Sequence, residues 1–152
     1  MNKTQEFKPK LVIVISQFNQ YIVERLLNGC LATLQKQGLD KKELTVIEVP
    51  GAFEIPVVVN KLIMSKKPDA IITLGAIIKG ETPHFDFISN CVSAEIARIS
   101  TDTLVPVIFG VLTVDTVQQA QDRSGEEESN KGSESALAAI KMANVMRSID
   151  SA

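Results

Sequence analysis

Short runs of mostly apolar residues recur along the 152-residue chain, at residues 11–15, 44–49, 70–75 and 106–113. Runs of this length, rich in Val and Ile, are typical of strands that are buried on both faces. In the segments between the runs, apolar residues recur every three or four positions, which is helical spacing. The pattern therefore predicts strands that alternate with helices.

Two residues mark where these helices begin or end. Gly38 is suited to end the first helix, and Pro56 to stand in the first turn of the second. The predicted helices cover residues 22–34, a segment that starts at 56, and residues 86–100, 115–122 and 131–149. Alternating strands and helices imply parallel pairing through right-handed crossovers. We therefore expect an α/β fold, a three-layer sandwich with a four-stranded parallel sheet.

The composition limits the classes of partner that we expect for this chain. The chain carries 16 Lys and Arg against 18 Asp and Glu, for a net charge of −2, with both signs interspersed. Neither a nucleic acid nor an anionic membrane is therefore an expected partner, and one Tyr with no Trp leaves little surface for stacking bases. We expect a single domain at residues 11–152 behind a polar N-terminal tail at residues 1–10.

Targeting and redox signals are sparse. No apolar run reaches the roughly 18 residues of a membrane span, and the N-terminus has no secretory h-region. Cys30 and Cys91 each fall within a helical pattern and form no CxxC pair, so both are predicted to be buried free thiols. These features favour a cytoplasmic protein.

Candidate chemistry gathers in the loops that follow the strands. Ligands of parallel sheets bind outside the carboxyl ends of the strands, which groups the loops at residues 18–19, 51–54, 76–84 and from 109 onward. His84, the one histidine of the chain, lies among them. Histidine changes charge near neutral pH, so His84 is the first candidate for proton transfer. The alternative is a loop histidine that only faces solvent.

The other loop residues offer binding groups. Phe18 could stack on a planar ring or fold back onto the core, and residues 50–54 offer backbone N–H groups and a carboxylate to a hydroxyl-rich ligand. Residues 80–82 precede a helix, where backbone N–H groups favour anions, although Glu81 opposes this unless its side chain points away. No dinucleotide or P-loop motif is present.

Two further expectations concern charged groups. Arg123 could hold a phosphate through two hydrogen bonds, or pair with Asp122 or Glu134. With one His, no Cys pair and no dense carboxylate cluster in the loops, no metal site is predicted.

Five sequence blocks, in this order, resemble the lumazine synthase family. They lie at residues 16–19 (SQFN), 49–56 (VPGAFEIP), 74–86 (LGAIIKGETPHFD), 106–113 (PVIFGVLT) and 130–132 (NKG), and the resemblance spans residues 11–147. It implies a flavodoxin-like fold and a cofactor-free step of riboflavin biosynthesis. In that step 5-amino-6-(D-ribitylamino)uracil condenses with 3,4-dihydroxy-2-butanone 4-phosphate to give 6,7-dimethyl-8-ribityllumazine, phosphate and water.

The resemblance also assigns roles to individual residues. His84 would be the proton donor, and Glu81, Thr82 and Arg123 would bind the butanone phosphate, the first two mainly through backbone N–H groups. The ribitylaminouracil would be held by Phe18, Ala52, Phe53, Glu54, Ala76, Ile77, Ile78 and Phe109.

Assembly is implied as well. In the family the counterparts of Phe109 and Arg123 come from the neighbouring subunit of a pentamer, twelve of which can close into an icosahedral shell, and riboflavin synthase is a possible partner. The helix at 86–100 is apolar on most of its circumference, which fits burial against a neighbour as well as the sheet. Two departures from the family pattern are Gln17 and the acidic turn at 126–128, which could weaken contacts between pentamers.

Two other functions remain open at this point. A non-catalytic flavin- or lumazine-binding module would need the aromatic stack and Arg123 but not His84. A shell protein would keep the assembly surfaces but lose the pocket residues, all of which are present here.

Overall fold

The computed structural model describes residues 6–152, which form one parallel sheet with helices on both faces. The strands are β1 (Leu11–Ser16), β2 (Thr45–Val49), β3 (Ala70–Ile78) and β4 (Val107–Val114). The α-helices are α1 (Gln20–Lys36), α2 (Ile55–Lys66), α3 (His84–Thr103), α4 (Val117–Asp122) and α5 (Lys131–Asp150). One-turn 3₁₀ helices lie at η1 (Lys41–Glu43), η2 (Ala52–Glu54) and η3 (Glu127–Ser129).

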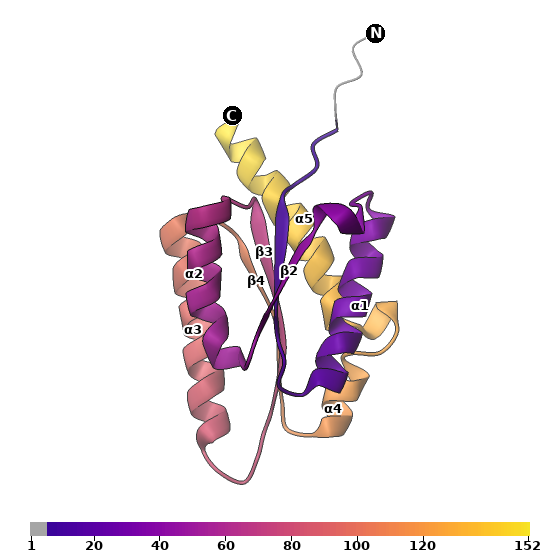
Figure 1. The fold of residues 1–152 in the computed structure, drawn as a ribbon, viewed down its shortest axis with the longest axis vertical. Coiled ribbons are helices and arrows are strands. Elements are labelled where there is room, and N and C mark those ends of the chain that lie inside the picture. The colour runs from indigo at the N-terminus through magenta and orange to yellow at the C-terminus, as the bar shows by residue number, and fades with distance from the viewer. Residues whose placement is uncertain (1–5) are drawn as a thin grey trace.

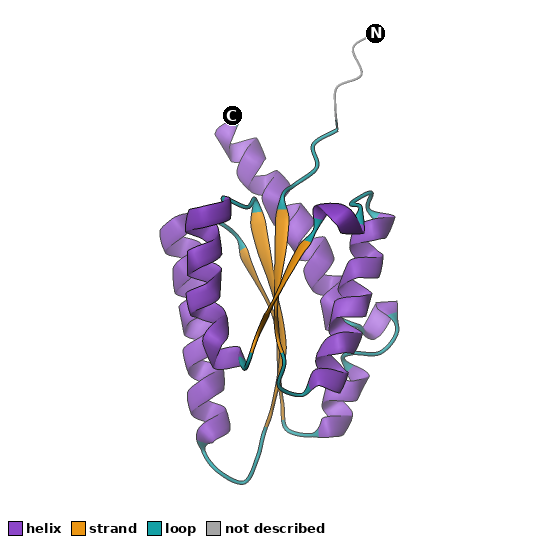
Figure 2. Ribbon diagram, viewed as in Figure 1, coloured by secondary structure: helices purple, strands orange, loops and turns teal. Residues whose placement is uncertain are grey.

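The predicted three-layer sandwich is confirmed. The strand order is β2-β1-β3-β4, and every pairing is parallel. Helices α1, α4 and α5 cover one face of the sheet, while α2 and α3 cover the other (Figures 1 and 2). The alternation of side chains along β1 explains these layers, because Ile13 packs with α1 and α5 whereas Val14 packs with α2 and α3.

The strands differ in length at the end that carries the candidate loops. Pairing between β1 and β3 stops at Ile15 and Leu74, whereas β3 continues beside β4 to Ile78, opposite Val114. The last residues of β3 therefore extend beyond the end of β1, and the edge of β3 that faces β1 has no strand partner there.

The helix ends follow local sequence signals only in part, because α1 begins at Gln20 and α4 at Val117, each two residues from its predicted start. Gly38, with φ of 90°, ends α1 as predicted, and the Leu39 N–H donates to the Leu34 carbonyl in a Schellman-type closure. The start of α3 differs from the prediction, because this helix begins at His84 rather than near residue 86. Pro83 precedes it with φ of −68°, which suits the entry to a helix.

The two thiols lie in different environments, which corrects one prediction. Cys30 is buried as predicted, and burial raises its thiol pKa to about 12. Cys91 is exposed, because α3 turns a different stripe, formed by Val92, Ile96 and Ile99, towards the sheet. Helical spacing alone did not show which stripe of α3 faces inward.

The predicted N-terminal tail is described only from residue 6, and residues 1–5 lie outside the described part. Within it, the Lys10 N–H donates to the Asp69 carboxylate at 2.6 Å, and the guanidinium of Arg147 lies 4.1 Å from the centre of the Phe7 ring. None of the helices in residues 6–152 has the length and hydropathy needed to cross a membrane.

Candidate active site

A cavity of about 580 Å³ opens at the carboxyl ends of β1, β2 and β3. Residues from the loops after all three strands, from the end of β3 and from the first turns of α3 line it. They are Phe18, Gly51, Ala52, Phe53, Glu54, Ala76, Ile77, Ile78, Gly80, Thr82, His84, Phe85 and Ile88. Most of the site residues predicted from the sequence therefore meet in one place.

Phe18 lies at the mouth of this cavity. Its ring is 72% exposed, so the alternative in which it folds back onto the core does not hold. Hydrogen bonds to the next loop fix the backbone here, because the Gln17 N–H donates to the Val49 carbonyl at 2.8 Å and the Phe18 N–H to the Pro50 carbonyl at 3.2 Å. The result is an exposed aromatic ring on a backbone that two hydrogen bonds hold.

The loop after β2 forms a second wall. It closes into η2, where the Glu54 N–H donates to the Gly51 carbonyl at 3.2 Å. Ala52 is buried, Phe53 is 56% exposed and Glu54 is half-buried. The Glu54 carboxylate and the backbone of this turn can bind hydroxyl groups.

The projecting end of β3 forms the floor. Ala76 and Ile77 are buried and Ile78 is half-buried, so main-chain groups rather than side-chain polar atoms are what this strand offers to a ligand. The Ala76 carbonyl already accepts a hydrogen bond from Asn19 Nδ2 at 2.8 Å.

His84 is the first residue of α3, and its side chain is exposed beside the cavity. Its backbone N–H lies 3.4 Å from Thr82 Oγ1, which holds the turn before the helix. Thr82 and Gly80 line the cavity, whereas Glu81 is exposed and does not. The Glu81 side chain is thus outside the cavity, as its predicted backbone role requires.

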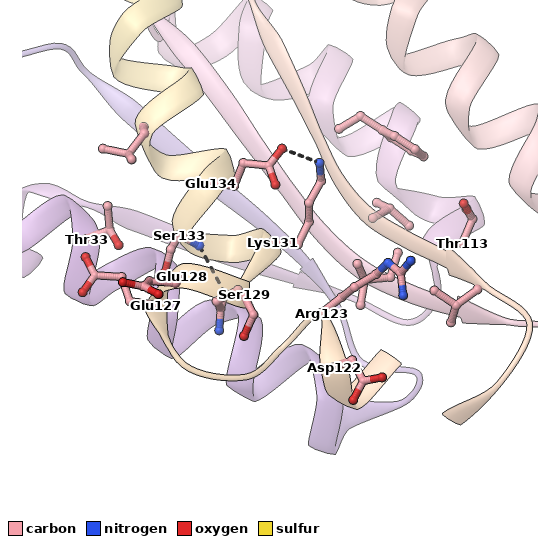
Figure 3. A pocket seen from close by; sticks show the side chains of 16 residues that line it. Thr33, Thr113, Asp122, Arg123, Glu127, Glu128, Ser129, Lys131, Ser133 and Glu134 are labelled. Carbon is pink, nitrogen blue, oxygen red and sulfur yellow. Dashed lines mark hydrogen bonds and ion pairs between the residues drawn. The ribbon is translucent and has the colours of Figure 1, made fainter. Parts of the chain in front are cut away.

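Phe109 and Arg123 lie elsewhere. They line a second hollow of about 1160 Å³ that β4, α4, η3 and α5 form (Figure 3). The exposed Arg123 guanidinium is 3.4 Å from the Gln119 carbonyl. Among residues 6–152, Arg123 forms no ion pair with Asp122 or Glu134, and Glu134 pairs instead with Lys131 at 2.8 Å.

The two hollows differ in charge. Of the described residues that line the first cavity, none is Lys or Arg, and Glu54 is the one acidic residue. The second hollow is lined by two cations, Arg123 and Lys131, and by four carboxylates, those of Asp122, Glu127, Glu128 and Glu134. The backbones of the two cations are joined, because the Lys131 N–H donates to the Arg123 carbonyl at 2.8 Å. One copy of the chain therefore separates the imidazole from the cations that could bind an anionic substrate.

Several lining residues were not predicted. Gly51, Gly80, Phe85 and Ile88 border the first cavity, and Lys131 the second. Positions 84, 85 and 88 share one side of a helix, so an earlier predicted start for α3 would have identified Phe85 and Ile88. Residues 6–152 contain no group of three or more His, Cys, Asp or Glu residues that could hold a metal ion.

Comparison with known protein families gives a match along nearly the whole chain. The model of a family described as 6,7-dimethyl-8-ribityllumazine synthase matches residues 8–147. Among solved structures, the chain is similar to the Bordetella bronchiseptica enzyme WbmH in complex with NAD+, at 16% sequence identity and a TM-score of 0.44. That match covers 91% of this chain, which spans about half (52%) of the WbmH chain.

Proposed function

The chain belongs to the 6,7-dimethyl-8-ribityllumazine synthase family, a family of transferases in riboflavin biosynthesis, and on this premise we propose its reaction. It condenses 5-amino-6-(D-ribitylamino)uracil with 3,4-dihydroxy-2-butanone 4-phosphate. The products are 6,7-dimethyl-8-ribityllumazine, inorganic phosphate and two molecules of water, one released when the imine forms and one when the ring closes.

The observation that carries this proposal is the first cavity. It combines an exposed aromatic ring, a turn suited to hydroxyl groups, a main-chain edge and an imidazole. Phe18 stacks on the pyrimidine, residues 52–54 hold the ribityl chain, and residues 76–78 meet the edge of the ring. The volume of about 580 Å³ is in the range of small-molecule sites.

His84 serves the proton transfers. The aromatic amine attacks the ketone, and the hydroxyl must be protonated to leave as water when the imine forms. Phosphate elimination and ring closure require further transfers. General acid–base help is typically worth about 10²–10⁴ in rate, whereas orienting two reactants can contribute up to roughly 7–11 kcal/mol. Positioning therefore dominates, and His84 accelerates a reaction that the cavity already favours.

Binding of the phosphate requires a second copy of the chain. The segment 81–82 offers backbone N–H groups near the start of α3, and a neighbour's Arg123 supplies the missing positive charge.

Exposed apolar side chains support the assembly of several copies. Phe53, Val57 and Phe87 are exposed on one part of the surface, and Val117 and Leu137 on another. Such head-to-tail surfaces are all covered when a ring closes. We propose a pentamer, in which a neighbour's Phe109 also completes the pocket.

The compartment, the cofactor requirement and the partners of the protein are proposed on the same premise of family membership. The reaction takes place in the cytoplasm and needs no metal or cofactor, because each step is an addition, an elimination or a proton transfer. Riboflavin synthase, which consumes the lumazine, is a proposed partner, and pentamers are proposed to assemble further into a shell.

The decisive experiment supplies both substrates to the purified protein. We expect lumazine absorbance and fluorescence to appear together with inorganic phosphate, and only when both substrates are present. Binding of added lumazine without its formation would instead support the non-catalytic module.

Light scattering tests the proposed pentamer and should show at least five subunits. Ala94→Arg, on the exposed side of α3, should lower the particle mass and the activity together. A fully active monomer of 16.6 kDa would contradict the pentamer.

A further inference from the structure

Asn19 occupies an unusual position between the ring of Phe18 and the first turn of α1. Its backbone is left-handed, with φ of 59° and ψ of 45°, a conformation that Asn tolerates better than most residues. Its carbonyl accepts hydrogen bonds from the N–H groups of Ile22 and Val23, so it begins the helix. Its side chain, however, makes no capping hydrogen bond to α1.

The amide of Asn19 is directed across the sheet instead. Asn19 Nδ2 donates to the carbonyl of Ala76, 57 positions later in the chain, at 2.8 Å. An Asn at a helix start ordinarily accepts a hydrogen bond from the next turn. Here the side chain links the loop after β1 to the end of β3, the strand whose last residues form the floor of the cavity.

This link falls at the place where β3 has lost its neighbour. Pairing with β1 ends at Leu74, so Ala76 and Ile78 present their main-chain groups to an open edge. The main-chain groups of residues 77 and 79 point the other way, towards β4, as the hydrogen bond from the Lys79 N–H to the Val114 carbonyl shows. Asn19 satisfies the Ala76 carbonyl at this edge, and Ile78 is the next position along it.

Phe18 depends on such anchors. Its ring is 72% exposed, so side-chain packing contributes little to holding it in place. On one side its own N–H is bound to Pro50, and on the other Asn19 binds Ala76. We propose that Asn19 is a positioning residue, which sets the Phe18 ring relative to the open edge of β3 so that a flat heterocycle can stack and meet the Ile78 backbone in one pose.

The ligand in this inference rests on the proposed function, and two substitutions test it. Asn19→Gly keeps the left-handed backbone accessible but removes the amide. Asn19→Asp keeps the size and the tolerance of that backbone but replaces the donor with a carboxylate oxygen, which cannot donate to Ala76. Gln20→Ala is the matched control, because within residues 6–152 the Gln20 side-chain amide donates to the exposed Glu24 on the helix surface and to no cavity residue.

Titration with 6,7-dimethyl-8-ribityllumazine, followed by fluorescence, gives the main readout. We expect both Asn19 variants to bind it about fivefold more weakly and to raise KM for the ribitylaminouracil similarly, since a hydrogen bond is worth roughly 1 kcal/mol net. Affinity for inorganic phosphate, by calorimetry, should stay unchanged, and Gln20→Ala should match the wild type. A purely structural role would instead lower the melting temperature and weaken both ligands together.

Each outcome is informative. If Asn19→Gly binds the lumazine as tightly as the wild type, or if both ligands weaken in parallel, the positioning role is overturned. If the wild type binds lumazine in an Asn19-dependent way but never forms it, the proposed reaction fails while the positioning role stands. If the wild type forms lumazine and the variants bind it normally, only the positioning role fails.

Discussion

At the scale of single residues, the cavity leaves most of the chemistry to one side chain. Phe18, Ile77, Phe85 and Ile88 supply apolar contact, whereas His84 offers an imidazole, which can donate and accept protons. Its place at the first residue of α3 puts the imidazole on a rigid element while leaving the ring exposed to the cavity. Activity should therefore be sensitive to His84 without depending on it entirely.

Replacing His84 with Ala tests this division of labour. We expect kcat to fall by about 10²-fold, the lower part of the range for general acid–base catalysis, while lumazine formation remains measurable because both substrates are still oriented. Stopped-flow absorbance at saturating substrates measures it. Lys79→Ala is a suitable control, since Lys79 is exposed and does not line the cavity. Wild-type turnover in His84→Ala would remove the proton-transfer role.

Cys30 makes a separate prediction about pH. Its pKa is raised from 9.0 to about 12 by burial, so above pH 9 the unfolded chain loses this proton while the folded chain keeps it. The unfolded state then binds fewer protons, and the free energy of unfolding must fall as pH rises from about 9 to 12. Below pH 9 the thiol is neutral in both states and contributes no pH dependence.

The measurement compares urea denaturation at pH 8 and pH 10. We expect the wild type to lose about 1.4 kcal/mol more than Cys30→Ala between these two values, because the ionised fraction of the unfolded thiol rises about tenfold and one unit of pKa corresponds to about 1.4 kcal/mol. Titration of other groups affects both proteins alike and cancels in the difference. Equal losses in the two proteins would show that the Cys30 thiol is not protected in the folded state.

At the scale of secondary structure, the sequence predicted the layers better than the details. The β-branched runs placed all four strands, and Gly38 and Pro56 ended and began helices where predicted. Cys91 was placed wrongly because the α3 sequence offers several weakly apolar stripes, and only contact with the sheet selects one of them. Hydrophobic spacing cannot make that choice, since it measures periodicity and not direction.

The site was predicted in the same uneven way. The loops after the strands were placed at one edge from topology alone, because the carboxyl ends of parallel strands share an edge. The tie from Asn19 to Ala76 was missed, since a hydrogen bond across 57 positions leaves no local pattern. The overhang of β3 was missed too, because strand lengths alone do not give the register.

The contact between α1 and α5 allows a sharp test. A Cβ at Gly132 would overlap the Leu26 carbonyl oxygen, so the backbone of one helix must move. Asn130 secures the same contact, and it donates to the Arg25 carbonyl while it accepts from the Gly132 N–H. Gly132→Ala should therefore lower the free energy of unfolding by about 3 kcal/mol, at the upper end for overpacking.

Gly80→Ala is the matched control for this prediction. A Cβ at Gly80 meets nothing within 4 Å, so the free energy of unfolding should change by less than about 0.5 kcal/mol. Urea denaturation of both variants makes the comparison. Equal stability of Gly132→Ala and the wild type would mean that α1 and α5 do not approach this closely in solution.

At the scale of the whole molecule, the separation of the two hollows is the central fact. Helix α3, which begins at His84, lies on one side of the sheet, whereas Arg123 follows α4 on the other side (Figures 1 and 3). In one copy of the chain, His84 and Arg123 therefore line different hollows. The sequence alone could not give this separation, because Arg123 follows a loop at the same edge of the sheet as His84. Only the resemblance to a known family predicted that a neighbour supplies it.

Mixing two impaired variants, assayed at a butanone phosphate concentration well below the wild-type KM, tests the shared site directly. His84→Ala leaves Arg123 intact, and Arg123→Ala leaves His84 intact but should raise KM for the butanone phosphate at least about tenfold, since a charge-assisted hydrogen bond is lost. If the site joins two copies, rings reassembled from an equal mixture contain some interfaces with both residues. By random assortment about one quarter of the interfaces are complete. Activity should thus recover to about a quarter of the wild-type value.

The pattern of recovery distinguishes a shared site from a site within one chain. Recovery should appear only after the two variants are dissociated and reassembled together, and not on simple mixing of intact rings. The double variant, with both substitutions in one chain, should yield no recovery when it is reassembled with itself. If the reassembled mixture merely averages the activities of the two single variants, His84 and Arg123 do not act across an interface. In that case Arg123 must reach the cavity of its own chain, which its place beyond β4 argues against.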